Sequence, residues 1–508
     1  MKNILEYLEK SEERFPEKTA YSDRNGSITF RSFAVSARRL GTHLAEYGLK
    51  GRPAAVFMEK SVDMITGFMG TVYAGGFYCP VDISMPDSRI LTIFSVLRPA
   101  VLLTREKERE KAERLLEGLG QASGVKLVIL EDALKTPEDP AVLQGIRRTS
   151  VDSDPLYVLF TSGSTGVPKG VLVPHRVMIS NMEWLEKEYH FNENDVLGNQ
   201  VPFYFDVSDH DIYCVLKFGC SMEIIPPEYF AFPARLVQFL NERRVTAVFW
   251  VPFALSMAAN LDAFRKEKPQ YLRFIFFAGE VMPVKQLNYW RKHVPQAVYS
   301  NMYGPTETYV CTYYNLDREF ADDEALPIGY PVSYADVMVL DENNRPVVPG
   351  DGRSGELCVR GCTLALGYYN SPEKTAERFV QNPLQNAWPE TVCRTGDLVS
   401  YNDRGELVFL SRKDFQIKHL GYRIELGEIE TAAGAMENID ECACIYDNGR
   451  KQILLVYSGE KMDRKEMLSA LSVKLPKYML PNRMIHMEVL PRNANGKIDR
   501  KELGKMLT

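Results

Sequence analysis

The sequence predicts an α/β protein with a large N-terminal region of mostly parallel sheets flanked by helices and a small α+β domain at the C-terminus. Short apolar runs alternate with helical patterns through most of the chain, which is typical of parallel sheets covered by helices. Beyond Asp414 the elements become short and follow an α+β order, which predicts a boundary between 1–413 and 414–508. A chain of 508 residues is long enough for two such units.

The expected elements follow from the periodicity of the apolar residues. Phe33, Ala37, Leu40 and Leu44 recur at helical spacing and predict a helix over 32–48. The other expected elements are a strand from 54, a helix over 64–76, a charged amphipathic helix with a solvated face over 105–116, buried strands over 156–160, 247–251 and 274–277, a helix from 427, a strand over 452–459, a helix over 464–475 and a strand over 484–490.

Composition and charge exclude several classes of protein. The 61 basic and 67 acidic residues give a net charge of −6 and are spread along the chain, so no basic patch for nucleic acid or an anionic membrane is expected. The N-terminus is charged and helical rather than a signal peptide. No apolar run approaches the about 18 residues of a membrane span. Nine cysteines without metal-ligand spacing fit reduced thiols, so we expect a cytoplasmic protein.

The segment 157–170, YVLFTSGSTGVPKG, predicts a phosphate-binding loop after a buried strand. Glycines bring the backbone close to a ligand, and consecutive backbone N–H groups form an anion-binding concavity. The common phosphate loop differs, because here Pro168 precedes the lysine and Gly170 stands where a Ser or Thr would bind Mg²⁺. A flexible linker is the alternative, and the preceding strand argues against it. The candidate phosphate ligands are Thr161, Ser162, Gly163, Ser164, Thr165, Gly166 and Lys169.

A second constellation, NMYGPTETYV, covers 301–310. Gly304 begins a Gly-Pro turn that allows Tyr303 and Thr306 to face one ligand from opposite sides. A tyrosine here suits stacking on a base, and the threonine suits a phosphate. Glu307 is a hard oxygen ligand of the kind that Mg²⁺ takes together with phosphates. Such a turn on its own is more often structural.

Two further residues suit nucleotide chemistry. Asp397, in CRTGDLV, follows a strand. A carboxylate commonly binds ribose by accepting hydrogen bonds from its two vicinal hydroxyl groups. Lys497 follows the turn signal Asn495-Gly496 and would be displayed at a loop tip. Without context, Lys497 would be read as a surface lysine.

Together these motifs resemble the adenylate-forming superfamily of acyl-CoA synthetases, luciferases and nonribosomal peptide synthetase adenylation domains. The resemblance covers nearly the whole chain, with the motifs in family order. It implies ATP and Mg²⁺ as cofactors, a loop that holds the triphosphate tail, and a mobile C-terminal domain that hinges at Asp414. Departures at Cys393, Ser411 and Ala494 remove no ligand-contacting group.

The resemblance also assigns individual roles. It makes Lys497 the catalytic lysine that stabilises charge on the α-phosphate, and Glu307 the metal ligand. The implied nucleotide contacts are Asn301 and Tyr303 to adenine, Thr306 to the α-phosphate, Asp397 to ribose with support from Arg412, and further contacts from Gly279, Glu280, Met302 and Gly304.

The acid that is activated is predicted to be a small amino acid. Asp206, in FYFDVSDHDIY, would be a carboxylate in an otherwise apolar pocket, and an α-ammonium would pair with it. Asp209 and Asp211 alternate with it and are expected to face elsewhere, one of them as a helix cap. The resemblance places the pocket wall at Val207, His210, Phe253, Phe276, Ala278, Met302, Val310 and Cys311, which suits alanine, D-alanine, proline or serine. His210 would either supply a polar contact or pack inertly.

Within the superfamily the chain is similar to stand-alone D-alanine–carrier protein ligases, through FIFFAGEVMPVKQL, LPIGYPV and DFQIKHLGYRIELGEIE. Ala278 departs from a cysteine common in those ligases and leaves proline or another small amino acid open. No carrier segment follows Lys497, so a separate phosphopantetheinylated carrier protein is the expected acceptor. Two rivals remain: an acyl-CoA synthetase with coenzyme A as acceptor, and an inactive nucleotide-binding scaffold.

Overall fold

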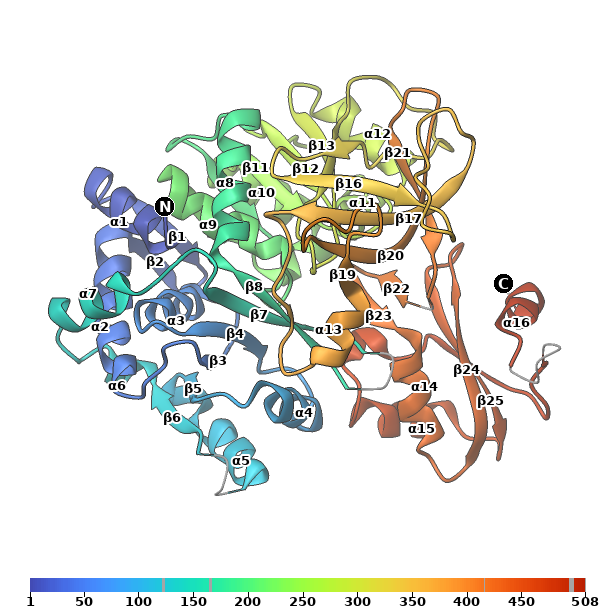
Figure 1. Ribbon diagram of the computed structural model, residues 1–508, viewed down its shortest axis with the longest axis horizontal. Coiled ribbons are helices and arrows are strands. Elements are labelled where there is room, and N and C mark those ends of the chain that lie inside the picture. The colour runs from blue at the N-terminus through green and yellow to red at the C-terminus, as the bar shows by residue number, and fades with distance from the viewer. Residues whose placement is uncertain (121–123, 164–166, 415, 493–497, 508) are drawn as a thin grey trace. The chain divides into compact units, whose positions relative to one another are not determined.

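The computed structural model describes residues 1–120, 124–163, 167–414, 416–492 and 498–507 (Figure 1). The chain forms two compact units. Unit 1 comprises Met1–Ile83, Arg98–Leu159 and Val171–Lys413, and unit 2 comprises Ser84–Leu97, Phe160–Gly170 and Asp414–Thr508. The long segment of unit 2 thus begins at Asp414, and the predicted phosphate loop groups with it.

The first large sheet of unit 1 has seven strands in the order β18-β8-β7-β4-β3-β5-β6. β3, β4, β5, β6 and β7 are linked by parallel pairs, whereas β18 runs antiparallel to β8. The predicted mostly parallel arrangement is therefore confirmed here. The strands are β3 (Pro53–Met58), β4 (Phe77–Asp82), β5 (Val101–Thr104), β6 (Lys126–Ile129), β7 (Pro155–Thr161), β8 (Lys169–Pro174) and β18 (Gly367–Tyr368).

The second large sheet has nine strands in the order β15-β14-β13-β12-β11-β9-β10-β1-β2. Its central strands pair in parallel, and the four residues of β12 are all buried, as expected for a strand covered on both faces. The strands are β1 (Thr19–Asp23), β2 (Gly26–Thr29), β9 (Val196–Asn199), β10 (Ser221–Ile224), β11 (Ala247–Trp250), β12 (Phe274–Phe277), β13 (Val298–Tyr303), β14 (Thr312–Asn315) and β15 (Tyr330–Pro331).

Helices α3 and α9 connect the cores of the two large sheets. The ring of Phe68 on α3 lies edge-on to Phe203, and the hydroxyl groups of Tyr78 on β4 and Tyr213 on α9 are 2.6 Å apart. The helices of unit 1 are α1 (Leu5–Arg14), α2 (Phe30–Ala45), α3 (Val62–Tyr73), α5 (Arg109–Leu119), α6 (Leu130–Ala133), α7 (Pro140–Arg148), α8 (His175–Tyr189), α9 (Val207–Phe218), α10 (Pro233–Glu242), α11 (Pro252–Asn260), α12 (Val284–His293), α13 (Pro372–Arg378) and the 3₁₀ turns η1 (Glu106–Glu108) and η3 (Pro227–Ala231).

The segment 105–116 differs from the single solvated helix that was expected. A 3₁₀ turn precedes α5, and Arg105 is buried, where it forms ion pairs with Glu108, Asp63 and Glu59. Charge along this segment therefore serves packing as well as solvation.

A third sheet in unit 1 is antiparallel throughout and was not anticipated. β20 and β21 are joined by a tight turn in which the Asn402 side chain accepts from the Glu406 N–H and Gly405 has φ +73°. Such hairpin connections produce antiparallel pairs. The strands are β16 (Ala335–Leu340), β17 (Ser354–Gly361), β19 (Phe379–Gln381), β20 (Thr391–Tyr401) and β21 (Leu407–Arg412).

Unit 2 has the predicted α+β character, with a two-stranded and a three-stranded sheet. Leu420 and Gly421 both have positive φ and close the two-stranded hairpin. The predicted last strand is shorter than expected. The elements are α4 (Asp87–Leu97), β22 (Gln416–His419), β23 (Tyr422–Glu425), α14 (Leu426–Gly434), β24 (Ile439–Asp447), β25 (Gln452–Gly459), α15 (Arg464–Ser472), η4 (Lys477–Met479), β26 (Arg483–His486) and α16 (Arg500–Leu507).

All nine cysteines lie in the described ranges and are free thiols. Seven are buried, Cys442 is half-buried and Cys362 is exposed. Burial raises the pKa of Cys79 and Cys393 above the ordinary thiol range. In the part of the chain that the structure describes, no helix is long and apolar enough to cross a membrane.

A buried ion pair holds α4 to α14 within unit 2. The Arg89 guanidinium donates to Glu428 Oε1, and both side chains are almost completely buried. Burial raises the pKa of Glu428, while Arg89 and the Gly163 N–H oppose the rise. Removing one partner of such a pair leaves an uncompensated charge in the interior.

We expect Arg89→Met to lower the free energy of unfolding by about 3–5 kcal/mol at neutral pH. Because the folded-state pKa of Glu428 is raised, the folded protein binds this proton more tightly, and stability falls as pH rises through that range. Without Arg89 the pKa of Glu428 rises further. The decrease in the free energy of unfolding should therefore be smaller at about pH 5 than at about pH 8. Urea unfolding, followed by circular dichroism, measures the free energy of unfolding at each pH.

Arg24→Met is the matched control, because Arg24 pairs with Glu228 on the surface and should contribute less than about 1 kcal/mol. Equal losses for Arg89→Met at both pH values would contradict a buried carboxylate that protonates.

Candidate active site

Three residues singled out in the sequence bind one another in unit 1. Asp397 on β20 lies opposite Arg412 on β21, whose guanidinium donates to Asp397 Oδ1. The hydroxyl of Tyr303, at the end of β13, donates to Asp397 Oδ2. Burial, with the Asp397 charge beside it, raises the pKa of Tyr303 well above its usual range, so the hydroxyl stays a donor. The carboxylate is thereby fixed in orientation and keeps lone pairs for further donors.

The backbone around Asp397 is held equally firmly. The Thr395 hydroxyl accepts from the Asp397 N–H at 3.1 Å and donates to the Leu357 carbonyl at 2.7 Å. Gly396 has φ +72°, and a Cβ there would lie 2.9 Å from Arg378 Nη1 and 3.0 Å from Arg412 Nη2. Only glycine fits this position without moving the arginines.

Glu307 is buried and held by a partner that the sequence did not reveal. The Tyr368 hydroxyl donates to Glu307 Oε1 at 2.6 Å, and the Ala365 N–H donates to the Glu307 carbonyl at 3.0 Å. Tyr368 lies 61 residues away on β18, and only the fold brings it to Glu307. Among the described residues, no cluster of three His, Cys, Asp or Glu side chains is arranged to hold a metal. Mg²⁺ at Glu307 would therefore take its other oxygens from phosphate and water.

The predicted turn at Gly304 is present. The Thr308 N–H donates to the Pro305 carbonyl at 2.8 Å, and a Cβ on Gly304 would lie 1.4 Å from the Tyr309 carbonyl oxygen. Thr306 is partly exposed at the tip. Asn301, by contrast, uses its amide nitrogen to bind the Pro327 carbonyl at 2.7 Å.

The described part of the predicted phosphate loop contacts β23 within unit 2. The Ser162 hydroxyl donates to the Arg423 carbonyl and accepts from the Glu425 N–H, both at 2.9 Å. Lys169 Nζ lies 3.3 Å from Glu425 Oε1, which also accepts from Gln416 Nε2 at 2.8 Å. Of the loop's donors, the Ser162 hydroxyl therefore already binds a carbonyl oxygen, and Lys169 already pairs with a carboxylate.

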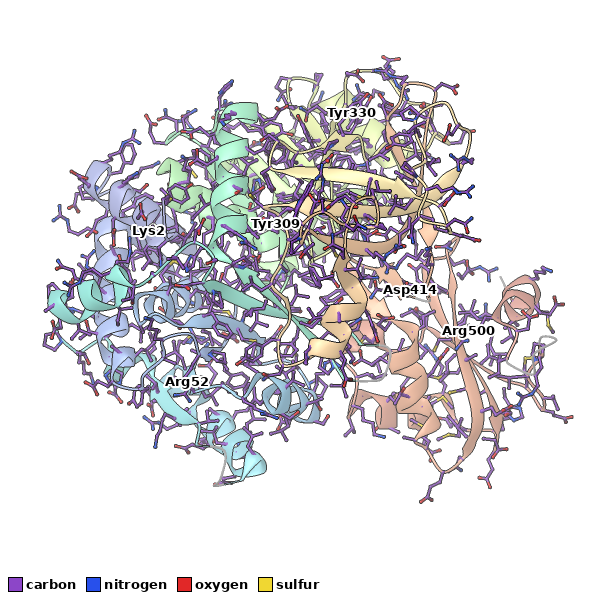
Figure 2. All side chains as sticks on the ribbon, viewed as in Figure 1. Lys2, Arg52, Tyr309, Tyr330, Asp414 and Arg500 are labelled. Atoms are coloured by element: carbon purple, nitrogen blue, oxygen red, sulfur yellow. The ribbon has the colours of Figure 1, made fainter. Side chains whose placement is uncertain are left out.

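Other loop residues complete this region. The Thr161 hydroxyl is 3.4 Å from the Lys169 carbonyl, and a Cβ on Gly163 would lie 2.0 Å from the Val167 carbonyl. Asp414 is exposed where the chain passes from unit 1 to unit 2 (Figure 2). Ser164, Thr165, Gly166 and Lys497 lie outside the described residues.

Several of the expected pocket residues are buried or half-buried in unit 1. Asp206 is half-buried, directly before α9, and makes no side-chain cap. His210 is fully buried, edge-on to Phe249 and Phe276, with Nδ1 3.7 Å from Cys214 Sγ. The residues that share one apolar cluster are Val207, Phe276, Ala278, Met302 and Val310.

Two other expected pocket residues differ from these in their surroundings. Cys311 belongs to a different buried cluster, with Tyr303, and its thiol faces the Tyr303 carbonyl. Phe253 is 38% exposed at the start of α11, where its N–H donates to Glu280 Oε2 at 3.2 Å. Gly279 has φ +95° at the end of β12.

The expectation that Asp209 or Asp211 caps a helix is wrong. Both lie inside α9 and are buried. Asp211 Oδ2 accepts from Asn199 Nδ2 at 2.7 Å. Burial raises the pKa of Asp209 well above its usual range, Tyr157 partly offsets the rise, and Asp206 adds to it.

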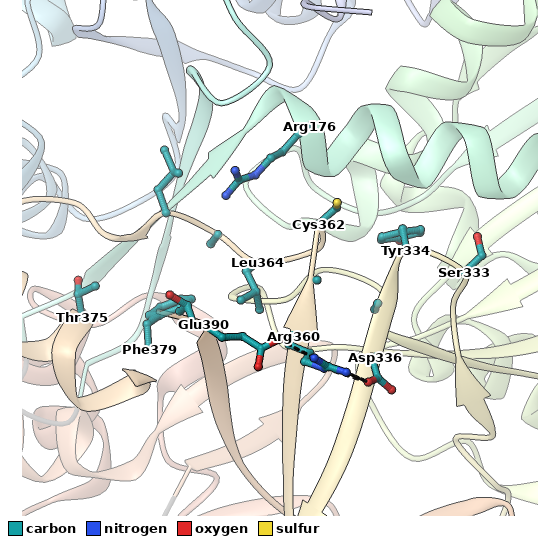
Figure 3. A pocket seen from close by; sticks show the side chains of 15 residues that line it. Arg176, Ser333, Tyr334, Asp336, Arg360, Cys362, Leu364, Thr375, Phe379 and Glu390 are labelled. Carbon is teal, nitrogen blue, oxygen red and sulfur yellow. Dashed lines mark hydrogen bonds and ion pairs between the residues drawn. The ribbon is translucent and has the colours of Figure 1, made fainter. Parts of the chain in front are cut away.

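A groove of about 880 Å³ in unit 1 is lined by other residues, among them Ala365, whose N–H donates to the Glu307 carbonyl. Arg176 and Cys362 line it, and Arg360 crosses it to bind Asp336 and Glu390 (Figure 3). The described residues along the groove include none of those predicted to act in binding or catalysis.

If Glu307 binds Mg²⁺, Tyr368→Phe should weaken the apparent Mg²⁺ affinity by about 10-fold, because it removes the hydrogen bond that orients the carboxylate. Titration of Mg²⁺ in an ATP–pyrophosphate exchange assay measures this. Tyr369→Phe, at the neighbouring position, is the control. An unchanged Mg²⁺ curve for Tyr368→Phe would show that this hydroxyl does not position a metal ligand.

Comparisons with known proteins identify the family of the chain. The profile of the AMP-binding enzyme family matches residues 8–369. The chain is 34% identical over 507 residues to L-proline--[L-prolyl-carrier protein] ligase of Streptomyces coelicolor, covering 94% of this chain and 91% of that protein. It is 32% identical over 515 residues to tyrocidine synthase 3 of Brevibacillus parabrevis, covering 99% of this chain but only 8% of the relative.

The chain thus spans less than half the length of several long synthetase relatives that it matches. Its fold is similar to that of the Vibrio cholerae adenylation domain AlmE, solved with glycyl-adenosine-5'-phosphate, with a TM-score of 0.84, 20% identity, and coverage of 99% of this chain and 97% of that one. The family profile covers well over half of the sequence. The chain therefore belongs to the AMP-binding enzyme family, within the adenylate-forming superfamily.

Proposed function

We propose that this chain activates a small amino acid with ATP, forming an aminoacyl adenylate and releasing pyrophosphate, and then transfers the aminoacyl group to the phosphopantetheine thiol of a separate carrier protein. The observation that carries the proposal is Asp206. It is a half-buried carboxylate beside Val207, which packs against a buried apolar cluster. A carboxylate in that setting is a suitable partner for the α-ammonium of an amino acid.

The size of the substrate follows from the apolar wall. Phe276 and Met302 are both almost fully buried and reduce the available room. D-alanine, proline, L-alanine and serine are the candidates that fit. Similarity to a prolyl-carrier protein ligase supports proline among them and supports a carrier protein as acceptor.

Polar side chains that other residues hold in place would bind ATP and Mg²⁺. Adenylate-forming enzymes use ATP and Mg²⁺, and Mg²⁺ would supply neutralisation of phosphate charge at Glu307. Asp397, oriented by Tyr303 and Arg412, would accept the ribose hydroxyls. Because these groups are held before the ligand arrives, little reorganisation is needed during reaction.

In unit 2, Lys169 would hold phosphate oxygens as a point charge. It must first leave Glu425, which pairs with it in this structure. Lys497 would stabilise the charge that develops during adenylate formation, and Asp414 would be the hinge that carries this lysine away before the thiol attacks.

ATP–pyrophosphate exchange across the L- and D-amino acids tests the proposal. We expect one small amino acid to support exchange, and Asp206→Ala to lower its kcat/KM by at least about 100-fold, because the ammonium loses its partner. Lys497→Ala should abolish exchange. Asp336→Asn changes an exposed carboxylate far along the chain and should leave exchange unaltered.

Exchange with fatty or aryl acids alone, insensitive to Asp206→Ala, would indicate an acyl-CoA synthetase instead. ATP binding without exchange for any acid would indicate an inactive nucleotide-binding scaffold.

A further inference from the structure

A lysine joins the two large sheets of unit 1 at the start of the loop that leads to Asp206. Lys60 lies just after β3, in the seven-stranded sheet. Its Nζ donates to the Gln200 carbonyl at 3.0 Å and to the Asn199 carbonyl at 3.5 Å. Asn199 is the last residue of β9, in the nine-stranded sheet. The contact therefore joins the carboxyl ends of two strands, and ligands of open α/β sheets bind at such ends.

An aromatic ring holds the same ammonium group further along the loop. Lys60 Nζ lies 5.4 Å from the centroid of the Phe203 ring. Phe203 is 2% exposed and packs edge-on against Phe68 of α3. A cation near the face of an aromatic ring is attracted by the charge distribution of the ring. One side chain thus holds the loop at its first residues, through two carbonyl groups, and again at Phe203.

A hydrogen bond continues this network into α9. Asn199 Nδ2 donates to Asp211 Oδ2 at 2.7 Å, and both residues are completely buried. Asn199 therefore accepts from the ammonium of Lys60 with its carbonyl and donates to the Asp211 carboxylate with its side chain. Burial lowers the pKa of Lys60 to about 7, and the charge of Asp211 opposes the decrease. Buried charges of this kind need polar partners, and Asn199 supplies one to each.

Asp206 lies between the two points at which this network holds the chain. It follows Phe203 by three residues and precedes Asp211 by five. Between them, the Phe205 N–H donates to the Pro202 carbonyl at 3.1 Å, and the chain turns from the loop directly into α9. A shift of the loop would therefore shift the Asp206 carboxylate.

Helix capping explains a similar lysine at the other end of α9 but does not explain Lys60. Lys18 Nζ donates to the carbonyls of Glu193 and Gly219 and lies 5.8 Å from the centroid of the Phe15 ring. Because Gly219 directly follows α9, Lys18 binds the C-terminal end, where a cation is favourable. Lys60 binds the loop on the N-terminal side of α9, where the helix dipole favours no cation.

We propose that Lys60 is a positioning residue, which fixes the main chain of 199–203 and thereby holds Asp206 in place to bind the α-ammonium of the amino acid. This rests on the proposed function, in which Asp206 binds that group. A carboxylate that is already in position need not be ordered when the substrate binds. The contacts of Lys60 described above involve no residue proposed to bind ATP, so the amino acid alone should depend on it.

The test is Lys60→Met in ATP–pyrophosphate exchange with the full chain, using whichever L- or D-amino acid gives the most exchange. Methionine keeps most of the length of lysine and removes its charge and its donors. We expect the KM for the amino acid to rise at least about 10-fold, because a carboxylate displaced by a fraction of an ångström binds the ammonium poorly. The KM for ATP should change less than about 2-fold, and kcat less than about 3-fold, since the lost interaction serves binding.

Lys18→Met is the matched control, because Lys18 has the same kinds of partner at the opposite end of α9. It should lower the melting temperature and leave both KM values unchanged. Phe203→Leu is a second variant, which keeps the hydrogen bonds of Lys60 and removes the ring beside its ammonium. We expect it to raise the KM for the amino acid by about 3-fold, and it provides the test if Lys60→Met does not fold.

The other outcomes separate this inference from the proposed function. An unchanged KM for the amino acid in Lys60→Met, or in Phe203→Leu if Lys60→Met does not fold, would overturn the positioning role while amino-acid activation stands. Equal increases in both KM values, or the same increase for Lys18→Met, would indicate a general loosening of the fold and would also overturn it. A lower kcat at an unchanged KM would contradict a role in binding. Exchange with no amino acid in the unaltered protein would overturn the proposed function itself.

Discussion

One buried carboxylate ties two sheets of unit 1 together. Asp397 belongs to the antiparallel sheet, where Arg412 is its cross-strand neighbour, while Tyr303 reaches it from the end of the nine-stranded sheet. A carboxyl group at this depth is tolerable only because both of its oxygens accept hydrogen bonds. The relative position of the two sheets is therefore coupled to the residues proposed to hold the nucleotide, and the fold and the site depend on the same three side chains.

The sequence predicted what local patterns encode. β3, β11 and β12 lie where apolar runs predict strands, and the turn at Gly304 follows from its Gly-Pro pair. The antiparallel sheet was not foreseen, because β16 and β21 are partly exposed and no helix–strand alternation marks the sheet.

In the candidate site, too, the sequence predicted individual residues but not the contacts that the fold creates between them. Tyr303 and Asp397 were each identified, but not their contact, since it joins residues 94 apart. Tyr368 gave no signal in the sequence. Asp209 or Asp211 was expected to cap a helix, because a polar residue at a helix start often does so. Lys169 was expected to bind phosphate, whereas in this structure its side chain forms an ion pair with Glu425. The free energy of phosphate binding at Lys169 is therefore the difference between its interaction with phosphate and the ion pair with Glu425 that phosphate would replace.

The distribution of the thiols has a practical consequence. Cys362 is the exposed cysteine among the nine, all of which are described, and it faces the groove crossed by Arg360 (Figure 3). Even Cys442, which is half-buried, has its pKa raised to about 11 by burial, so little thiolate forms there at neutral pH. The native protein thus carries a built-in attachment point for a maleimide fluorophore or spin label, and reporter groups can be introduced without first removing the other cysteines.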